Sequence, residues 1–187
     1  MCSERVLRVD VLPTLPPELL DQAWRFYHRT FRPLAVRAVQ RHVLHRGEFD
    51  ELMADGRVTK YVARADGAVV GLAAMTEDLT TLPLLSTDYF AHRWPDLYEQ
   101  RRIVYCLFVG VHSGPRGEGV FVDLQREMYK QVAAVRGMVV LDICAYNEAE
   151  LGLPWSIEAI LKPIAGDAVA TRLDSQSYWL YEFPDAA

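Results

Sequence analysis

Long apolar runs are missing from this chain of 187 residues, and so is any excess of positive charge. No apolar run approaches the roughly 20 residues that span a bilayer, and the N-terminus lacks a basic stretch followed by an apolar core. The net charge of −5 argues against a broad nucleic-acid-binding surface. We therefore expect a protein whose partners include neither a membrane nor a nucleic acid.

Cysteine is scarce as well. Cys2, Cys106 and Cys144 show neither the spacing of metal ligands nor an evident pairing, which is typical of a reducing compartment, and we expect a cytoplasmic protein. Cys106 and Cys144 lie in apolar runs, where a thiol behaves as a small buried side chain. The length and the 51% apolar content predict a single soluble globular domain over residues 1–187.

The most informative stretch follows residue 102. An apolar run at 103–109 predicts a buried strand, a glycine-rich turn follows at 110–119, and apolar residues recur at helical spacing over 120–135. A strand, turn and helix in this order present unpaired N–H groups and the positive end of the helix dipole to an anion. An ordinary strand-to-helix turn with several glycines is the alternative interpretation.

The segment 111–120 resembles the pyrophosphate loop of the GNAT superfamily of acyl-CoA-dependent N-acyltransferases, whose pattern is Gln/Arg-x-x-Gly-x-Gly/Ala. Arg116 and Gly119 occupy the first and fourth positions of this pattern. Phe121 stands where the pattern has Gly or Ala, so a large side chain replaces a small one beside the phosphate loop. This departure predicts a displaced loop or a weakened phosphate site.

Periodicity and turn signals predict further elements along the chain. They are a strand at 5–12, helices at 17–31, 36–43 and 49–53, strands at 57–65 and 68–76 joined by Asp66-Gly67, a strand at 138–145, a helix at 155–164, and a closing hairpin of strands at 168–173 and 177–183. The same order is found in GNAT folds. The resemblance therefore implies an α/β (α+β) fold: a mixed, mostly antiparallel sheet with helices on both faces.

Two features of this sheet are specific expectations. The parallel strands at 103–111 and 138–145 should splay apart near Val109 to Val111, and Gly110 is the predicted point of irregularity. Residues 79–101 form an aromatic-rich insertion, in which Pro95 should divide a helical segment. A lid over an acceptor site, a cover for a sheet edge and a homodimer surface are all consistent with it.

The resemblance also implies where acyl-CoA binds. The pantetheine arm would pair with main chain around Gly110, at Val109 and Val111, and an N–H near Val109 would polarise the thioester carbonyl. The pyrophosphate would meet main-chain N–H groups at the start of the helix. The residues of this predicted loop are Arg116, Gly117, Glu118, Gly119, Val120 and Phe121. Arg116 is also the predicted charged partner of a phosphate.

Transfer to an amine needs a group that removes a proton and one that supplies a proton to the leaving thiolate. The glutamate and tyrosine that serve many GNAT enzymes have no counterparts at the corresponding positions here. Glu77 or Asp78 is the predicted catalytic proton acceptor, and Tyr146 is the predicted catalytic donor. A solvated turn and a packed aromatic ring are the respective alternatives. Asp142 interrupts an apolar run and is therefore either paired or functional.

These features favour an N-acyltransferase, most simply an N-acetyltransferase, that moves an acyl group from acyl-CoA to the amine of a small molecule. Two alternatives keep the same fold. One is a protein that binds acyl-CoA or a partner without transfer, favoured by the missing base and acid. The other takes its acyl group from the phosphopantetheine of a carrier protein. An unrelated small α/β domain is the remaining alternative.

Overall fold

A single five-stranded sheet organises the computed structural model of the chain, which describes residues 7–40, 43–112, 115–166 and 168–183. The strands are β1 (Arg8–Leu12), β2 (Val58–Ala65), β3 (Ala68–Thr76), β4 (Ile103–Val111) and β5 (Met138–Val140), and they lie side by side in that order. All neighbours are antiparallel except β4 and β5, which are parallel. The predicted mixed, mostly antiparallel sheet is confirmed.

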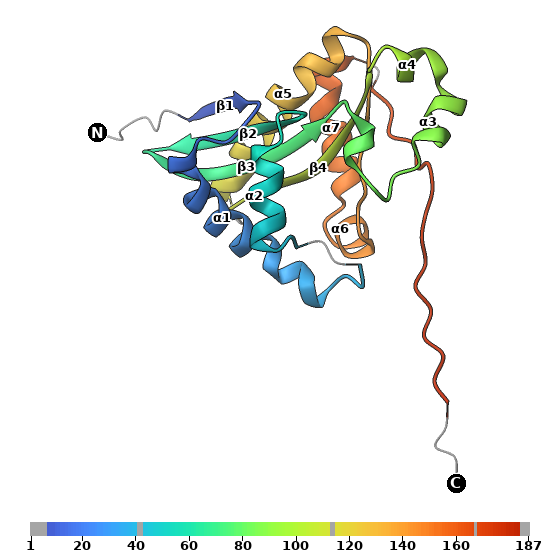
Figure 1. Cartoon of the computed structure of the whole chain (residues 1–187), viewed down its shortest axis with the longest axis horizontal. Coiled ribbons are helices and arrows are strands. Elements are labelled where there is room, and N and C mark those ends of the chain that lie inside the picture. Colours follow the sequence, from blue (N-terminus) through green and yellow to red (C-terminus); the bar gives the residue numbers. More distant parts are fainter. Residues whose placement is uncertain (1–6, 41–42, 113–114, 167, 184–187) are drawn as a thin grey trace.

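Helices cover both faces of this sheet (Figure 1). They are α1 (Pro17–Phe31), α2 (Arg46–Ala54), α3 (Thr87–Arg93), α4 (Pro95–Glu99), α5 (Pro115–Ala134), α6 (Ala145–Ala149) and α7 (Leu153–Ala165), with the 3₁₀ helices η1 (Arg32–Val36) and η2 (Leu79–Thr81). Pro17 opens α1 at a first-turn position, where its missing N–H costs nothing. The helix predicted from the apolar stripe at 17–31 is confirmed.

Two apolar clusters hold the layers together. On one face, Phe26 and Tyr27 of α1 pack with Phe49 of α2 and Leu72 of β3. On the other face, α5 and α7 pack against β2, β3 and β4 through a cluster that includes Leu124. The apolar stripe of each helix is thus buried against the sheet, which is the main source of helix stability in a folded protein.

The β2–β3 hairpin follows from its turn residues. Asp66 and Gly67 have φ values of 53° and 77°, the left-handed conformation that a tight two-residue hairpin turn requires. The two strands then pair along their whole length, from Val58 opposite Thr76 to Ala65 opposite Ala68. This predicted hairpin is confirmed, and it supplies the centre of the sheet.

The aromatic-rich insertion packs against the end of the sheet where β4 and β5 begin. Leu79 and Phe90 form a buried cluster with Ile103, and Met138 and Val140 of β5 pack around it. α4 begins at the proline that follows Trp94, so the predicted division of the helical segment is confirmed. The insertion therefore covers the starts of the two parallel strands.

Two predicted elements are corrected by the structure. The described part of 36–43 contains no α-helix, because η1 ends at Val36, and the side chains of Val36 and Val39 are exposed. No described element buries Val36 or Val39, although Val43 packs against the cluster of α1 and α2, and a short helix with little packing is unstable in water. The strand predicted over 138–145 ends at Val140, and Tyr146 therefore lies in α6 instead of at a strand end.

The hairpin predicted for the C-terminal segment is also wrong. Residues 168–183 have no strand partner among the described residues, and most of the segment runs away from the body (Figure 1). The segment has the composition and alternation of a strand. An alternating pattern, however, does not specify which edge of a sheet the strand will join.

Candidate active site

The parallel strands β4 and β5 pair briefly and then separate. Ile103 lies opposite Met138, and Tyr105 opposite Val140 is the last pair. β4 continues to Val111, and beyond Tyr105 its one strand partner among the described residues is β3. The predicted splay is confirmed, although it begins nearer to the start of β4 than expected. The edge of β4 beyond Tyr105 is therefore open on the side of β5.

A β-bulge in β4 lies next to this separation. Ala74 pairs with Phe108 but Met75 pairs with Cys106, which leaves Leu107 as the extra residue. The irregularity expected at Gly110 is wrong, because Gly110 stays in regular register with β3.

Gly110 is needed for a different reason. A Cβ at this position would lie 2.8 Å from the ring of Phe31, so the glycine lets the end of α1 pack directly on β4. Gly110 therefore allows α1 to pack closely on the sheet, and the bulge lies at another residue of β4.

The start of α5 lies against the end of β4. A Cβ on Gly117 would lie 1.6 Å from the carbonyl oxygen of His112, so only glycine permits this approach. Gly119 is exposed, and a Cβ there would meet no atom within 4 Å. The first N–H groups of α5 have no partners within the helix. The side chains of Arg116 and Glu118 lie outside the described part, so the phosphate contact of Arg116 stays a prediction.

The bulky residue that departs from the GNAT pattern is accommodated by the core. Phe121 is half-buried and packs, with Val120, against the apolar cluster between α5 and the sheet. The first turns of α5 therefore combine a close contact at Gly117, an exposed position at Gly119 and an apolar anchor at Phe121.

Tyr105 and Asp142 join the two parallel strands where they separate. The hydroxyl of Tyr105 donates a hydrogen bond to Asp142 Oδ1 at 2.5 Å. Burial, with this hydrogen bond, raises the pKa of Tyr105 well above its usual value, so the phenol stays protonated and remains the donor. Asp142 is exposed. An oriented carboxylate thus lies at the mouth of the splay, a pairing that spacing along the chain could not reveal.

Tyr146 contacts the connection between α1 and α2. Arg37 Nη1 donates a hydrogen bond to the hydroxyl of Tyr146 at 2.9 Å, and the guanidinium carbon lies 4.6 Å from the ring centroid. The two residues are 109 positions apart. This contact ties α6, which follows β5, to the segment that follows η1. The catalytic role of Tyr146 stays a prediction.

Glu77 and Asp78 follow β3 and lie beside the start of β4, because Thr76 pairs with Tyr105. Asp78 caps η2 by accepting hydrogen bonds from the N–H and the hydroxyl of Thr80 at 3.1 and 2.6 Å. These hydrogen bonds lower the pKa of Asp78. Glu77 is exposed. The register places both acids at the end of the sheet where Tyr105 lies.

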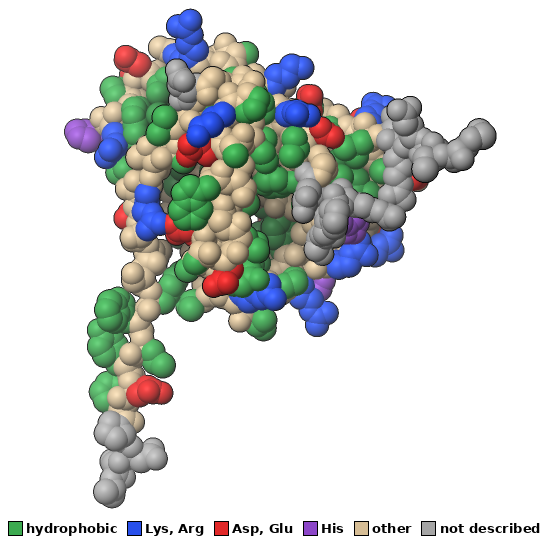
Figure 2. Space-filling view, turned by 180° about the vertical axis from the view of Figure 1, so that it is seen from behind, with side chains coloured by type: hydrophobic (Ala, Val, Ile, Leu, Met, Phe, Trp, Pro, Cys, Tyr) green, Lys and Arg blue, Asp and Glu red, His purple; other side chains and the backbone are tan. Residues whose placement is uncertain are grey.

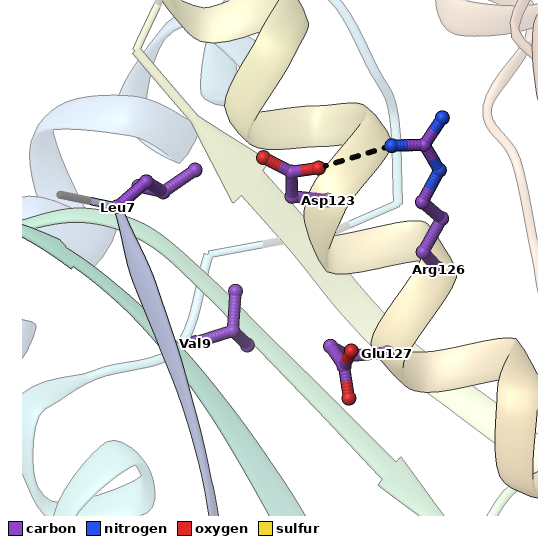
Figure 3. A pocket seen from close by; sticks show the side chains of 5 residues that line it. All are labelled: Leu7, Val9, Asp123, Arg126 and Glu127. Atoms are coloured by element: carbon purple, nitrogen blue, oxygen red, sulfur yellow. Dashed lines mark hydrogen bonds and ion pairs between the residues drawn. The ribbon is translucent and has the colours of Figure 1, made fainter. Parts of the chain in front are cut away.

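A separate hollow lies at the opposite edge of the sheet (Figure 3). Leu7 and Val9 line one wall, and Asp123, Arg126 and Glu127 of α5 line the other. Asp123 and Arg126 form an ion pair at 3.4 Å. Since β1 and β5 are the two outer strands, this hollow is not part of the β4–β5 opening.

Other kinds of site find little support in the described residues. No group of three His, Cys, Asp or Glu there could hold a metal ion, and no helix in that part is long and apolar enough to cross a membrane. Burial raises the pKa of Cys106 to about 12, so this thiol is protonated near neutral pH. Cys106 is thus a small core side chain, as expected.

Comparisons with solved structures decide the fold, because no protein-family model and no curated protein matches the chain. A possible acetyltransferase from Clostridium difficile 630 superposes with a TM-score of 0.58 at 13% identity, over 94% of this chain and 99% of that one. The aminoglycoside N-acetyltransferase AAC(6')-Iy in complex with CoA gives 0.56 at 12%, over 95% and 98%. A ribosomal-protein-alanine N-acetyltransferase from Brucella melitensis biovar Abortus 2308 gives 0.51 at 15%, over 94% and 99%. The chain has the GNAT fold.

Three local features of this chain can now be placed within the GNAT fold. The splay of β4 and β5, the bulge at Leu107 and the close approach of α5 at Gly117 all lie along one strand and its continuation. Identities of 12 to 15% establish the arrangement of the chain and leave its chemistry to be argued from its own residues.

Proposed function

We propose that this GNAT-fold chain transfers an acyl group, most simply acetyl, from acyl-CoA to the amine of a small molecule. The observation that carries the proposal is the open edge of β4 between Cys106 and Val111, which leads to the first turn of α5. An open strand edge offers main-chain donors and acceptors to an extended arm, and a helix start offers N–H groups to a phosphate. Gly117 brings the two features into contact.

The donor would extend along β4 to the start of α5. The pantetheine arm would lie along β4 at Val109, Gly110 and Val111, and the pyrophosphate would meet the helix start from Arg116 to Val120. Support comes from AAC(6')-Iy, which has this fold and has been solved both with CoA and with a CoA bisubstrate analogue. A main-chain N–H beside the bulge would stabilise negative charge on the acyl oxygen.

Asp142 is the proton acceptor that the geometry favours. In the reaction the amine nitrogen forms a bond to the acyl carbon, the carbon–sulfur bond breaks, and the ammonium must first lose a proton. Tyr105 orients Asp142 through one oxygen, and a carboxylate has capacity for further hydrogen bonds. Glu77 and Asp78 are the alternatives, but Asp78 already caps η2.

Tyr146 is the group proposed to return a proton to the departing sulfur. Its hydroxyl accepts a hydrogen bond from Arg37 Nη1, which leaves the phenol proton free to be donated. The acceptor itself would be cationic, because Glu77, Asp78 and Asp142 all lie near the start of β4 and the end of β5. Carboxylates at a substrate entrance attract an ammonium group.

The proposal is tested by calorimetric titration of acetyl-CoA and of CoA. The variants are Gly119→Glu and, as a matched control, Gly119→Ala. Space around Gly119 admits either side chain, but only glutamate adds negative charge beside the phosphates. We expect saturable binding by the wild type and by Gly119→Ala, and at least a tenfold weaker affinity for Gly119→Glu at an unchanged melting temperature.

Two other results would replace the proposed acyl transfer with a different function. A wild type that binds neither ligand would overturn the CoA-dependent reaction, and acylated carrier protein would then be tested as donor. Binding without product across a panel of polyamines, amino acids and aminoglycosides would identify a binding protein without transfer activity.

A further inference from the structure

The outer face of α1 carries a row of cations that continues past the end of the helix. Arg25, Arg29 and Arg32 follow one another at spacings of four and three residues, which places them on one side of the helix, and all three are exposed. Among the described residues no carboxylate pairs with Arg29 or Arg32. Like charges at a spacing of four residues destabilise a helix. The helix dipole favours cations in the last turn and does not account for Arg25.

A hollow of about 420 Å³ lies where α1 passes into η1, and two of these cations line it. Its lining residues are His28, Arg29, Arg32, Pro33 and Val36. Figure 2 shows Lys, Arg and His side chains gathered at the lower right of the body, on the side of α1. Val36 is exposed by 90%, so the hollow combines cations with apolar surface. This combination fits a nucleotide, whose base has an apolar face and whose phosphates are anionic.

His112 connects this side of α1 to the start of α5. Its ring lies against that of Phe26, with the centroids 5.0 Å apart, while its carbonyl oxygen lies in the close contact with Gly117. Burial, and after it the positive charge of Arg29, lowers the pKa of His112. The imidazole is therefore neutral near pH 7, and the positive charge beside the helix start comes from the arginine. The hollow thus adjoins the predicted pyrophosphate site.

CoA carries a third phosphate beyond its pyrophosphate, a phosphomonoester on the 3′ oxygen of the ribose. A phosphomonoester has a charge of about −1.5 to −2 at pH 7. Guanidinium groups bind such a group through paired, charge-assisted hydrogen bonds. With the pyrophosphate at the start of α5, an adenosine that turns towards α1 would meet the unpaired cations of the hollow.

We propose that Arg29 and Arg32 bind the 3′-phosphate of the acyl-CoA donor, with the adenine against Pro33 and Val36. The protein would thereby select CoA over donors that lack this phosphate. The inference rests on the proposed acyl transfer from CoA and adds to it a subsite formed by α1 and η1.

Calorimetric titration with acetyl-CoA and with its 3′-dephospho form tests the subsite. The wild type should bind acetyl-CoA at least tenfold more tightly, because the dephospho form leaves two arginines without an anion. Arg29→Gln/Arg32→Gln should weaken the binding of acetyl-CoA at least tenfold and leave that of the dephospho form unchanged. The control Arg93→Gln/Lys130→Gln removes two exposed cations of α3 and α5, and it should keep the wild-type preference.

The outcomes separate this inference from the proposed function. Equal affinities of the wild type for the two donors would overturn the subsite and leave acyl transfer from CoA standing, whereas a wild type that binds neither would overturn both. An equal loss for both donors in the double variant would reveal a general effect of charge and would also overturn the subsite. The single variant Arg32→Gln should show a smaller loss of preference at an unchanged melting temperature.

Two nucleotides test the subsite without the pantetheine arm. Adenosine 3′,5′-bisphosphate should displace acetyl-CoA from the wild type at a concentration at least tenfold lower than adenosine 5′-monophosphate does. The two nucleotides should become equivalent with Arg29→Gln/Arg32→Gln. If they are already equivalent with the wild type, the 3′-phosphate makes no contact that contributes to binding, and the proposal is wrong.

Discussion

The two halves of the sheet differ in how far their strands stay together. In the antiparallel half, β2 pairs with β3 along its whole length, and β3 continues the ladder to β4. In the parallel half, β4 and β5 share three pairs and then part. A tight turn keeps hairpin strands adjacent, whereas parallel strands depend on a crossover such as α5. The part of the fold with the weaker constraint is the part proposed to bind acyl-CoA.

The paired half and the open half of the sheet also differ in how they hold a charged side chain. Lys60, in the paired half, is fully buried, and its Nζ donates hydrogen bonds to the carbonyl oxygens of Pro13 and Asp55 at 2.9 and 2.5 Å. Asp142, in the open half, is exposed and held by Tyr105. A buried charge that is satisfied by main chain serves the fold, whereas an exposed and oriented one can serve a substrate.

The largest effect is expected from Asp142→Asn, which would remove the charge of the open half. Loss of a general base typically costs a factor of 10² to 10⁴, so kcat should fall at least about 100-fold. Tyr105→Phe should cost less, because it removes the orienting hydrogen bond and leaves the carboxylate. The measurement is kcat/KM against pH with an amine found to be a substrate.

The alternatives from the sequence serve as the comparison in that experiment. If Asp142→Asn keeps the wild-type rate while Glu77→Gln or Asp78→Asn loses it, the proton acceptor lies at the end of β3. Melting temperatures of all variants show whether a lost rate reflects unfolding.

The next effect concerns the junction of β4 and α5. Gly117→Ala would place a Cβ on the His112 carbonyl, and we expect a loss of about 3 kcal/mol in unfolding free energy, the upper end of overpacking costs. Gly119→Ala meets no atom and should stabilise α5 by up to about 1 kcal/mol, since alanine favours a helix. Urea denaturation measures both. Equal stabilities of the two variants would contradict the close contact.

The last effect is a gradual pH dependence in the paired half. Burial lowers the pKa of Lys60 from 10.5 to about 8. Between these values the unfolded chain binds a proton that the native chain lacks, so the unfolding free energy should rise with pH, by at most about 1.4 kcal/mol per unit. Lys60→Met should abolish that rise, and Lys130→Met, at an exposed position, should retain it. A slope unchanged by Lys60→Met would show that other groups cause it.

Local patterns predicted the elements that are stabilised locally. The Asp66-Gly67 turn and the strand at 103–111 appear where expected, whereas α5 begins at Pro115, within the turn predicted over 110–119. Each depends on neighbouring residues: a left-handed turn, an apolar run, or a stripe at helical spacing. The GNAT-like order of elements followed from these signals together.

Predictions that depended on packing against a distant segment of the chain were less accurate. The helix at 36–43 and the C-terminal hairpin had suitable patterns, but most of their large apolar side chains are exposed in the structure. The bulge was expected at Gly110 and lies at Leu107, because the register with β3 decides it and Gly110 instead admits Phe31. The irregularity predicted from this glycine was therefore wrong, and the glycine reflects a close contact between layers instead.

The amino-acid sequence by itself determined the order and type of most elements, because turns, apolar periodicity and helix starts are encoded within a few residues of one another. Only the tertiary structure decided which side chains meet at the candidate site. Tyr105 is 37 positions from Asp142, and Arg37 is 109 positions from Tyr146. Such pairs form only when strand register and layer packing bring distant segments within hydrogen-bonding range. The periodicity of the sequence does not show which distant residues will come that close.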